Sequence, residues 1–445
     1  VSGGFSNIGN LNGGTGTDVL TLSGGTLRGA INGGLTGVNT LTADNVANSW
    51  DITGSDAGSV TGITGGFTNI GTLSGGTNAD TFTFHSGGVL SGPVDGGAGS
   101  DTLDFSSYGT AVTASPTGTG SGKVSGTPDP ITYAGTNDYL NIESVNTGAG
   151  GGLVGPDQVN AWDITGVDAF TLNGTTYTGI STVTGGTLAD TFTVEDAGRL
   201  SGATAIDGGA GANVLQSVGN AAWSVTGANA GSITTTAGAT TFTNIQTLTG
   251  GAGSDGFTLN GGTVSGAING GTGVNTLTAD NVANSWTITG ANAGTVTGIT
   301  GGFSNIANLM GGSGSDVFTL SGGTVSGAIN GGAGSNTLIA DNVANTWTIS
   351  GANSGTVTGV TGGFSNIANL TGGSGNDAFT VGASGSVSGV IDGGGQVAGD
   401  TLDYSAVTAA VTSKIGTNFT NIESVTGDGV NDTLVGADVA NTWSI

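Results

Sequence analysis

The sequence predicts an all-β fold: a parallel β-solenoid in which successive coils of chain stack on one another. Regular glycine turns, short apolar runs between them and an internal repeat support this prediction. The 445 residues include 94 glycines and 5 prolines, and 8% of them are charged. Disordered chains usually carry more charge and more proline, so this composition favours short strands joined by tight turns.

An internal repeat of about 61 residues dominates the sequence, and self-similarity at a fixed period is the signature of a repeat architecture. The phrase FSNIANL, for example, begins at Phe303 and again at Phe364. Within this region glycine turns begin at Gly311, Gly331, Gly351 and Gly372. Their even spacing predicts a solenoid with coils of about 20 residues, grouped in threes to make the larger unit.

Each coil reads as two strands and two turns, which predicts a two-sheet β-roll. In 331–350, GGAGS is a turn, NTLIA a strand, DNVA a second turn and NTWTIS a second strand. Apolar and polar residues alternate in both strands, as in half-buried strands. Stacking the next coil at about 4.8 Å would pair the backbone amides and build a continuous apolar core.

The tryptophans share one local phrase and are predicted to fill the core of the second sheet. They are Trp50, Trp162, Trp223, Trp286, Trp347 and Trp443. The alternative is a ladder of tryptophans that binds carbohydrate, which would require the rings to face outward.

Two passages break the rhythm of one continuous solenoid. GGAGSDTLDFSSYGTAVT begins at Gly96 and GGGQVAGDTLDYSAVTAAVT at Gly393, and each leads to an NIESV motif. We therefore predict regular coils over 1–95 and 166–392, and irregular coils with long projecting loops over 96–165 and 393–445. The chain opens without methionine and stops inside a repeated motif, so we expect it to be part of a longer protein.

The charge balance excludes several classes of partner. The sequence has thirty acidic residues and only four basic ones, which gives a formal charge of −26; the basic residues are Arg28, Lys123, Arg199 and Lys414. Nucleic-acid grooves need clustered Lys and Arg, and anionic membranes repel such a surface. No apolar run approaches the roughly 18 residues of a membrane-spanning helix. We expect no nucleic acid, no membrane insertion and an attraction for cations.

The turns GGSGSD, GGSGND and GGAGSD resemble the glycine-aspartate nonapeptide repeats of haemolysin-type (repeats-in-toxin) secreted proteins. The passages that end in NIESV also resemble degenerate copies in very large bacterial surface proteins. The resemblance implies a parallel β-roll, secretion, and calcium held between adjacent turns. In that family the motif recurs with every nonapeptide. Here it appears once per coil, so at most one edge of the roll could hold metal.

The sixth position of the turn alternates between carboxylate and amide. Asp255 and Asn275 are followed, in the next repeat, by Asp316 and Asn336. We interpret most of these residues as turn formers that bond nearby backbone, with asparagines forming an amide ladder between well-spaced aspartates.

Two acidic clusters depart from this spacing, because carboxylates on adjacent turns repel one another unless a cation lies among them. Calcium takes about six to eight oxygen ligands from carboxylates and carbonyls. The predicted calcium ligands are Asp80, Asp95 and Asp101 in the first cluster, and Asp377, Asp392 and Asp400 in the second.

The sequence favours a structural function and not an enzyme. The four basic residues are scattered, and the single histidine, His85, follows a strand at a corner. We expect an extracellular or cell-surface stalk, or a self-assembling fibre of a biofilm matrix. Its partners would be copies of itself, end to end or lateral, a surface polysaccharide, or another surface protein. The alternative is a secreted, calcium-binding adhesin module that folds on calcium outside the cell.

Overall fold

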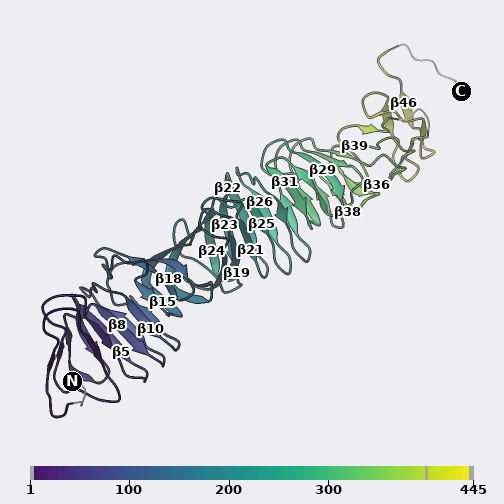
Figure 1. Ribbon diagram of the computed structural model, residues 1–445. Coiled ribbons are helices and arrows are strands. Elements are labelled where there is room, and N and C mark those ends of the chain that lie inside the picture. The colour runs from purple at the N-terminus through teal and green to yellow at the C-terminus, as the bar shows by residue number, and fades with distance from the viewer. Residues whose placement is uncertain (1–4, 396–398, 440–445) are drawn as a thin grey trace. The chain divides into compact units, whose positions relative to one another are not determined.

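The computed structural model describes residues 5–395 and 399–439 (Figure 1). These residues form strands, turns and bends, without an α-helix. A search of them finds no helix that could cross a membrane. The chain divides into two compact units, Val1–Leu215 with Thr235–Asn244, and Gln216–Thr234 with Ile245–Ile445. Both units are all-β, and their strands pair mostly in parallel, as the sequence predicts for a β-solenoid.

In the second unit, stacked strands form ladders that run through successive repeats. The first comprises β22 (Ala222–Gly227), β26 (Gly256–Leu259), β28 (Thr276–Thr278), β32 (Asn308–Met310), β34 (Ile329–Asn330) and β38 (Val360–Ser365). The second comprises β29 (Ser285–Gly290), β33 (Val317–Leu320), β35 (Thr337–Ile339), β39 (Asn369–Thr371), β41 (Ile391–Asp392) and β44 (Phe419–Thr420). A third begins with β36 (Thr346–Gly351), β40 (Ala378–Val381), β42 (Thr401–Asp403) and β45 (Ser424–Thr426).

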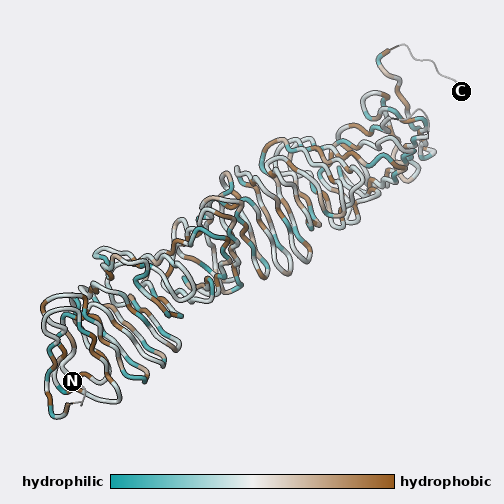
Figure 2. The backbone as a smooth tube through the Cα atoms, in the orientation of Figure 1, coloured by the Kyte–Doolittle hydropathy of each residue, from teal (hydrophilic) through white to brown (hydrophobic). Residues whose placement is uncertain are grey.

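The same core residues recur at the same places in these ladders. One ladder stacks Trp223, Phe257, Leu277, Leu309, Ile329 and Phe364 in register, and the next stacks Trp286, Phe318, Leu338, Leu370, Ile391 and Phe419. All of these side chains are buried. Figure 2 shows the hydrophobic residues recurring along the stacked coils, with hydrophilic residues between them. Every coil therefore completes the apolar contacts of the coil before it.

The first unit follows the same plan. One ladder comprises β2 (Val19–Thr21), β4 (Thr40–Thr42), β8 (Thr72–Gly76), β10 (Val94–Gly97) and β14 (Tyr139–Leu140). Another comprises β5 (Ser49–Gly54), β9 (Thr81–Phe84), β11 (Thr102–Asp104), β15 (Ser144–Val154) and β18 (Thr175–Thr184). Here Trp50 stacks on Phe82, with ring centroids 5.5 Å apart.

The third predicted coil of each repeat folds differently from the prediction. After β36, the chain reverses into β37 (Ser354–Val357) and reverses again into β38, so these three strands form an antiparallel meander. Two-residue turns separate them, and they contain Asn353 at φ 52° and Gly359 at φ 87°. Such short turns join only antiparallel strands, whereas parallel strands need a longer crossover.

The meander explains why the stacking step varies. Leu309 pairs with Ile329, which lies one predicted coil further along the chain. Ile329 then pairs with Phe364 and not with a residue one coil on, because the meander lies between the two strands. Strand β38 ends one ladder, and β36 begins another through its parallel pairing with β40. Equivalent residues of successive repeats therefore lie in different ladders.

The first irregular passage contains the same meander in a degenerate form. Strands β12 (Thr113–Gly118), β13 (Ser121–Ser125) and β14 pair antiparallel, and β12 pairs in parallel with β15. Ala114 occupies the position that tryptophan holds elsewhere, since it pairs with Leu153 of the next coil. In the second passage, β43 (Thr412–Lys414) pairs in parallel with β46 (Thr433–Val435), and in its described residues no antiparallel strand separates β43 from β44.

The prediction that the tryptophans belong to the core is confirmed for the residues that the structure describes. Trp50, Trp162, Trp223, Trp286 and Trp347 are all buried. Each stacks on the phenylalanine of the next strand in its ladder. Trp443 lies outside the described residues. Rings in this position are core side chains and not an exposed binding ladder.

Candidate functional site at the glycine turns

A buried polar residue precedes many ladder strands, either at the sixth position of a glycine turn or, as with Asn284, in the phrase VANSW. In the second unit, Asn284, Asp316 and Asn336 precede the successive strands β29, β33 and β35. All three are buried. We call such a series a polar ladder. Buried polar groups of this kind must find hydrogen-bond partners, and here they find them in the neighbouring coils.

Hydrogen bonding explains why carboxylate and amide alternate. The Oδ1 atom of Asp316 accepts from the backbone N–H and from the side-chain Nδ2 of Asn284, both at 2.8 Å. The backbone N–H of Asp316 donates to Oδ1 of Asn336 at 2.9 Å. Nδ2 of Asn336 then donates to the carbonyl of Asn366 at 2.9 Å. The side chain at position 316 only accepts hydrogen bonds, which a carboxylate can do. The side chain at position 336 must also donate one, which requires the amide.

The expectation that asparagines form an amide ladder between well-spaced aspartates is therefore wrong. Asp255 accepts from Ala221 and donates to Asn275, but this pair precedes β26 and β28, in a different ladder from Asp316 and Asn336. The meander moves each repeat to another ladder. Each amide therefore bonds its own aspartate and does not bridge between distant ones.

The first glycine of the turn makes room for the buried polar side chain. A Cβ atom on Gly311 would lie 2.3 Å from Oδ2 of Asp316 and 2.5 Å from the carbonyl oxygen of Gly331. Gly250 and Gly372 lie in the same way against Asp255 and Asp377. The glycine is thus required for close approach, beyond its freedom in tight turns.

Replacing Gly311 by alanine is expected to lower the free energy of unfolding by about 1–3 kcal/mol, because the added methyl group overlaps backbone and a fixed carboxylate. Urea denaturation measures the loss. Gly322→Ala is the control, because nothing lies within 4 Å of a Cβ atom added at this position. The φ of +78° at Gly322 still makes alanine strained there. Equal losses at the two positions would contradict the role of close approach.

The first predicted calcium cluster is a polar ladder with two consecutive carboxylates. Asp80 accepts from the backbone N–H of Asn48 at 2.7 Å and from its Nδ2 at 2.8 Å. The N–H of Asp80 donates to Oδ1 of Asp101 at 2.7 Å, and the N–H of Asp101 donates to Oε2 of Glu143 at 2.7 Å. Asp95 lies apart, where its Oδ1 accepts from Gly97 and from Nδ2 of Asn141.

The second cluster repeats this arrangement. Asn345 donates twice to Oδ1 of Asp377, the N–H of Asp377 donates to Asp400 at 2.7 Å, and the N–H of Asp400 donates to Glu423 at 2.8 Å. Asp392 again lies apart, accepting from the N–H of Gly394 and from Nδ2 of Asn421. The structure therefore brings together two of the three predicted residues in each cluster. Each pair is joined through a backbone amide.

Asp101 occupies a place that elsewhere holds an amide. A Cβ on Gly270 would lie 2.2 Å from the carbonyl oxygen of Asn305 and 2.6 Å from Nδ2 of Asn275, which donates to that carbonyl. A Cβ on Gly96 would lie 2.1 Å from the carbonyl oxygen of Asn141 and 2.6 Å from Oδ2 of Asp101. Oδ2 of Asp101 thus lies where the regular ladder has the amide nitrogen of an asparagine, such as Nδ2 of Asn275.

That oxygen is buried and has no hydrogen-bond partner in the structure. The pKa of Asp101 is raised to about 6, mainly by burial; the negative charges of Asp80, Glu143 and Asp95 contribute to the rise, and the hydrogen bond from the Asp80 backbone opposes it. A carboxylate cannot donate to a carbonyl, whereas the protonated acid can. The site therefore requires a proton or another positive charge.

These side chains do not make up a calcium shell by themselves. Oδ1 of Asp80, Asp95 and Asp101 each accept protein N–H donors, and the three carboxylates do not converge. Among the described residues, no group of three or more His, Cys, Asp or Glu side chains is arranged to hold a metal ion. Calcium needs about six to eight oxygens, so the fit is poor.

Sequence reasoning missed the other members of these ladders. Glu143 and Glu423 end them, and Asn48 and Asn345 begin them. A signal was present, because the NIESV motif places a glutamate where the regular NIANL motif has alanine, and it occurs where the amide is replaced by aspartate. Asn48 and Asn345 each precede a tryptophan by two positions, in the repeated phrase VAN[ST]W.

Comparisons with known proteins add no relative to this picture. No protein-family model matches the chain, and no curated protein matches it.

Proposed function

We propose that this chain is a structural segment of an extracellular β-solenoid protein, a stalk or fibre component of a cell surface. The observation that carries the proposal is the recurrence of whole ladders. Trp, Phe, Leu, Leu, Ile and Phe stack in the same order in two successive ladders of the second unit. Such repetition sets length and distributes load through backbone hydrogen bonds, since each coil contacts mainly its neighbours.

Composition supports a place outside the cell. Four basic residues in 445 offer few sites to trypsin-like proteases, and a charge of −26 keeps a repetitive chain soluble. The partners that suit such a surface are further copies of the chain, end to end or side by side, a surface polysaccharide or another surface protein.

Single-molecule pulling tests the structural function. We expect the chain to resist force and then lengthen in steps, because a repeat whose ladders are broken releases as a unit. One repeat of about 61 residues would release roughly 220 Å of extended chain. Smooth lengthening at the force of an unfolded polypeptide would contradict a load-bearing function. Mass per length from electron microscopy separates a single stalk from a polymerised filament.

The second candidate is the secreted module that folds on calcium, favoured by the unpartnered Oδ2 of Asp101 beside a carbonyl. We expect chelation by EDTA at pH 8 to leave the β signal in circular dichroism unchanged, because protein groups supply the ladder hydrogen bonds. Magnesium at the same concentration is the control for ionic strength. Loss of the β signal on chelation and its return with calcium would favour the adhesin module instead.

A further inference from the structure

An apolar residue in the turn after a ladder strand is regularly covered by a short parallel strand from its own repeat. Val325 donates its N–H to the carbonyl of Gly359 at 2.8 Å, and Thr361 donates to the carbonyl of Val325 at 2.9 Å. Val264 pairs in the same way with Gly298 and Thr300, both at 2.9 Å. In the first of these pairs the covering residue between the two bonds is Val360, and it lies opposite Val325.

Four covering tripeptides of this kind share one pattern, glycine or proline, then isoleucine or valine, then threonine. They are Gly62-Ile63-Thr64 over Leu27, Pro130-Ile131-Thr132 over Leu90, Gly298-Ile299-Thr300 over Val264, and Gly359-Val360-Thr361 over Val325. The covered residues are at most 6% exposed. A parallel strand with this pattern therefore matches both the backbone and the apolar surface of the position.

Val387 is the corresponding residue of the following repeat, and it has no such cover in the part of the chain that the structure describes. It is half-buried, unlike its four counterparts. The reason lies in the repeat that runs from Phe364 to Phe419, which is shorter than the one from Phe303 to Phe364. It omits the antiparallel strand between β43 and β44 and the turn after that strand, where the covering tripeptide begins in the other repeats, so the tripeptide is absent from it.

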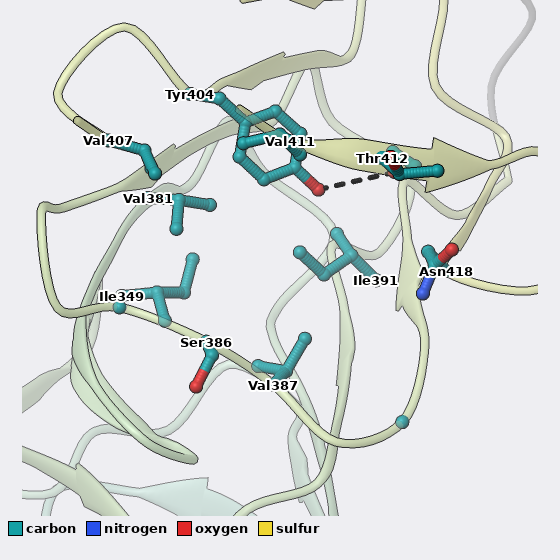
Figure 3. Close-up of a pocket in the computed structure, with 13 residues that line it drawn as sticks. Ile349, Val381, Ser386, Val387, Ile391, Tyr404, Val407, Val411, Thr412 and Asn418 are labelled. Carbon is teal, nitrogen blue, oxygen red and sulfur yellow. Dashed lines mark hydrogen bonds between the residues drawn. The ribbon is translucent and has the colours of Figure 1, made fainter. Parts of the chain in front are cut away.

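A cavity of about 210 Å³ lies beside Val387. Figure 3 shows Ile349, Val381, Val387 and Ile391 around it, with Tyr404 above, whose hydroxyl lies 3.5 Å from Oγ of Ser413. Its walls combine apolar side chains, such as Val381 and Ile391, with polar ones, such as Ser413 and Asn418. It can therefore receive the side chain that a covering strand would present.

The first irregular passage shows the same position filled. There Phe84, Leu90 and Tyr108 stand where the second passage has Val381, Val387 and Val407. Tyr108 donates its hydroxyl to the carbonyl of Pro128, and Leu90 donates its N–H to the carbonyl of Pro130. The second passage lacks both the large side chains and the covering segment, so its apolar surface and backbone groups stay open.

We propose that Val387 and the adjacent cavity bind an extended segment of a partner polypeptide with the sequence (Gly/Pro)-(Ile/Val)-Thr. The segment adds as a parallel strand: its first carbonyl accepts from the N–H of Val387, its threonine N–H donates to the carbonyl of Val387, and its branched side chain enters the cavity. The four tripeptides within residues 1–445 that follow the pattern at covered positions are already paired within their own repeats, so the bound segment is none of these. Main-chain bonds give affinity and the pocket gives specificity.

A synthetic peptide tests the site in the whole chain. The probe is TVTGVTGGFS, residues 356–365 with blocked ends, and the readout is hydrogen exchange at the Val387 amide. We expect saturating peptide to slow this exchange at least tenfold, with no change at the amide of Val325, which is already bonded. A peptide carrying N-methyl threonine at the position of Thr361 lacks the donor and should not slow the exchange.

Two variants give a matched control. Val387→Asp should abolish the effect of the peptide, whereas Val430→Asp, at a valine that is 48% exposed, should preserve it. Circular dichroism checks that both variants keep the β fold. The proposal is overturned if the Val387 amide of the free chain exchanges as slowly as that of Val325. It is also overturned if millimolar peptide has no effect, or if the methylated peptide acts equally.

Discussion

Replacing Trp347 by alanine is expected to lower the free energy of unfolding by about 3–5 kcal/mol, among the largest losses that a single core substitution causes. The side chain is fully buried. Its ring stacks on Phe379 with centroids 5.3 Å apart and meets Phe364 edge-on at 5.8 Å. It thus packs the first strand of one ladder against the last strand of another. Urea denaturation followed by circular dichroism measures the loss.

Trp347→Phe separates the effect of side-chain volume on stability from the effect of the buried indole N–H. The indole Nε1 of Trp347 is buried without a hydrogen-bond partner, and the same is true of the other four described tryptophans. A buried unpaired donor costs about 1–3 kcal/mol, so phenylalanine loses contact area but removes this cost. We expect it to retain most of the stability. Val343→Ala, at an exposed turn, should change stability by no more than about 0.5 kcal/mol. A loss below about 1 kcal/mol for the alanine variant of Trp347 would contradict the packing described.

Replacing Asn336 by aspartate is expected to destabilise the chain by about 1–3 kcal/mol at pH 8, with a smaller loss at pH 4. Nδ2 of Asn336 donates to the carbonyl of Asn366, and an ionised carboxylate would place an oxygen against that carbonyl. Protonation restores a donor, which is why acid should reduce the loss. Urea denaturation across this pH range measures it. A loss that is equal at both pH values would contradict the donor requirement.

Asp101→Asn is the reciprocal change and should stabilise the chain at pH 8. The folded pKa of Asp101, about 6, is raised above the value of about 3.9 in an unfolded chain. The folded state therefore holds the proton more tightly, and this stabilisation is fully present below about pH 4 and is lost as pH rises through 6. The amide supplies the donor at every pH, so the variant should lose this dependence.

Four other buried aspartates provide the control for that experiment. Burial also raises the pKa of Asp80, Asp255, Asp316 and Asp377. Their contribution has the same sign, so some loss of stability with rising pH should persist in Asp101→Asn. An unchanged pH profile in the variant would show that Asp101 does not hold the proton.

The sequence by itself determined the class of fold and the contents of its core. Glycine turns at a spacing of about 20 residues, alternating apolar residues and six tryptophans in one repeated phrase were enough, because turn chemistry and side-chain alternation are local properties. They also indicated that the sixth position of each turn, as at Asp316 and Asn336, holds a polar group bonded to nearby backbone. The structure places both residues there.

Only the tertiary structure decided which coils are neighbours. Two-residue turns at Asn353 and Gly359 reverse the chain, so that the third predicted coil becomes a meander and the next repeat enters another ladder. Spacing along the chain does not report this reversal. It therefore could not show that Asp101 replaces an amide donor, or that Asp95 lies apart from the acids it was grouped with. Those facts depend on which carbonyl each side chain faces, and folding alone sets that pairing.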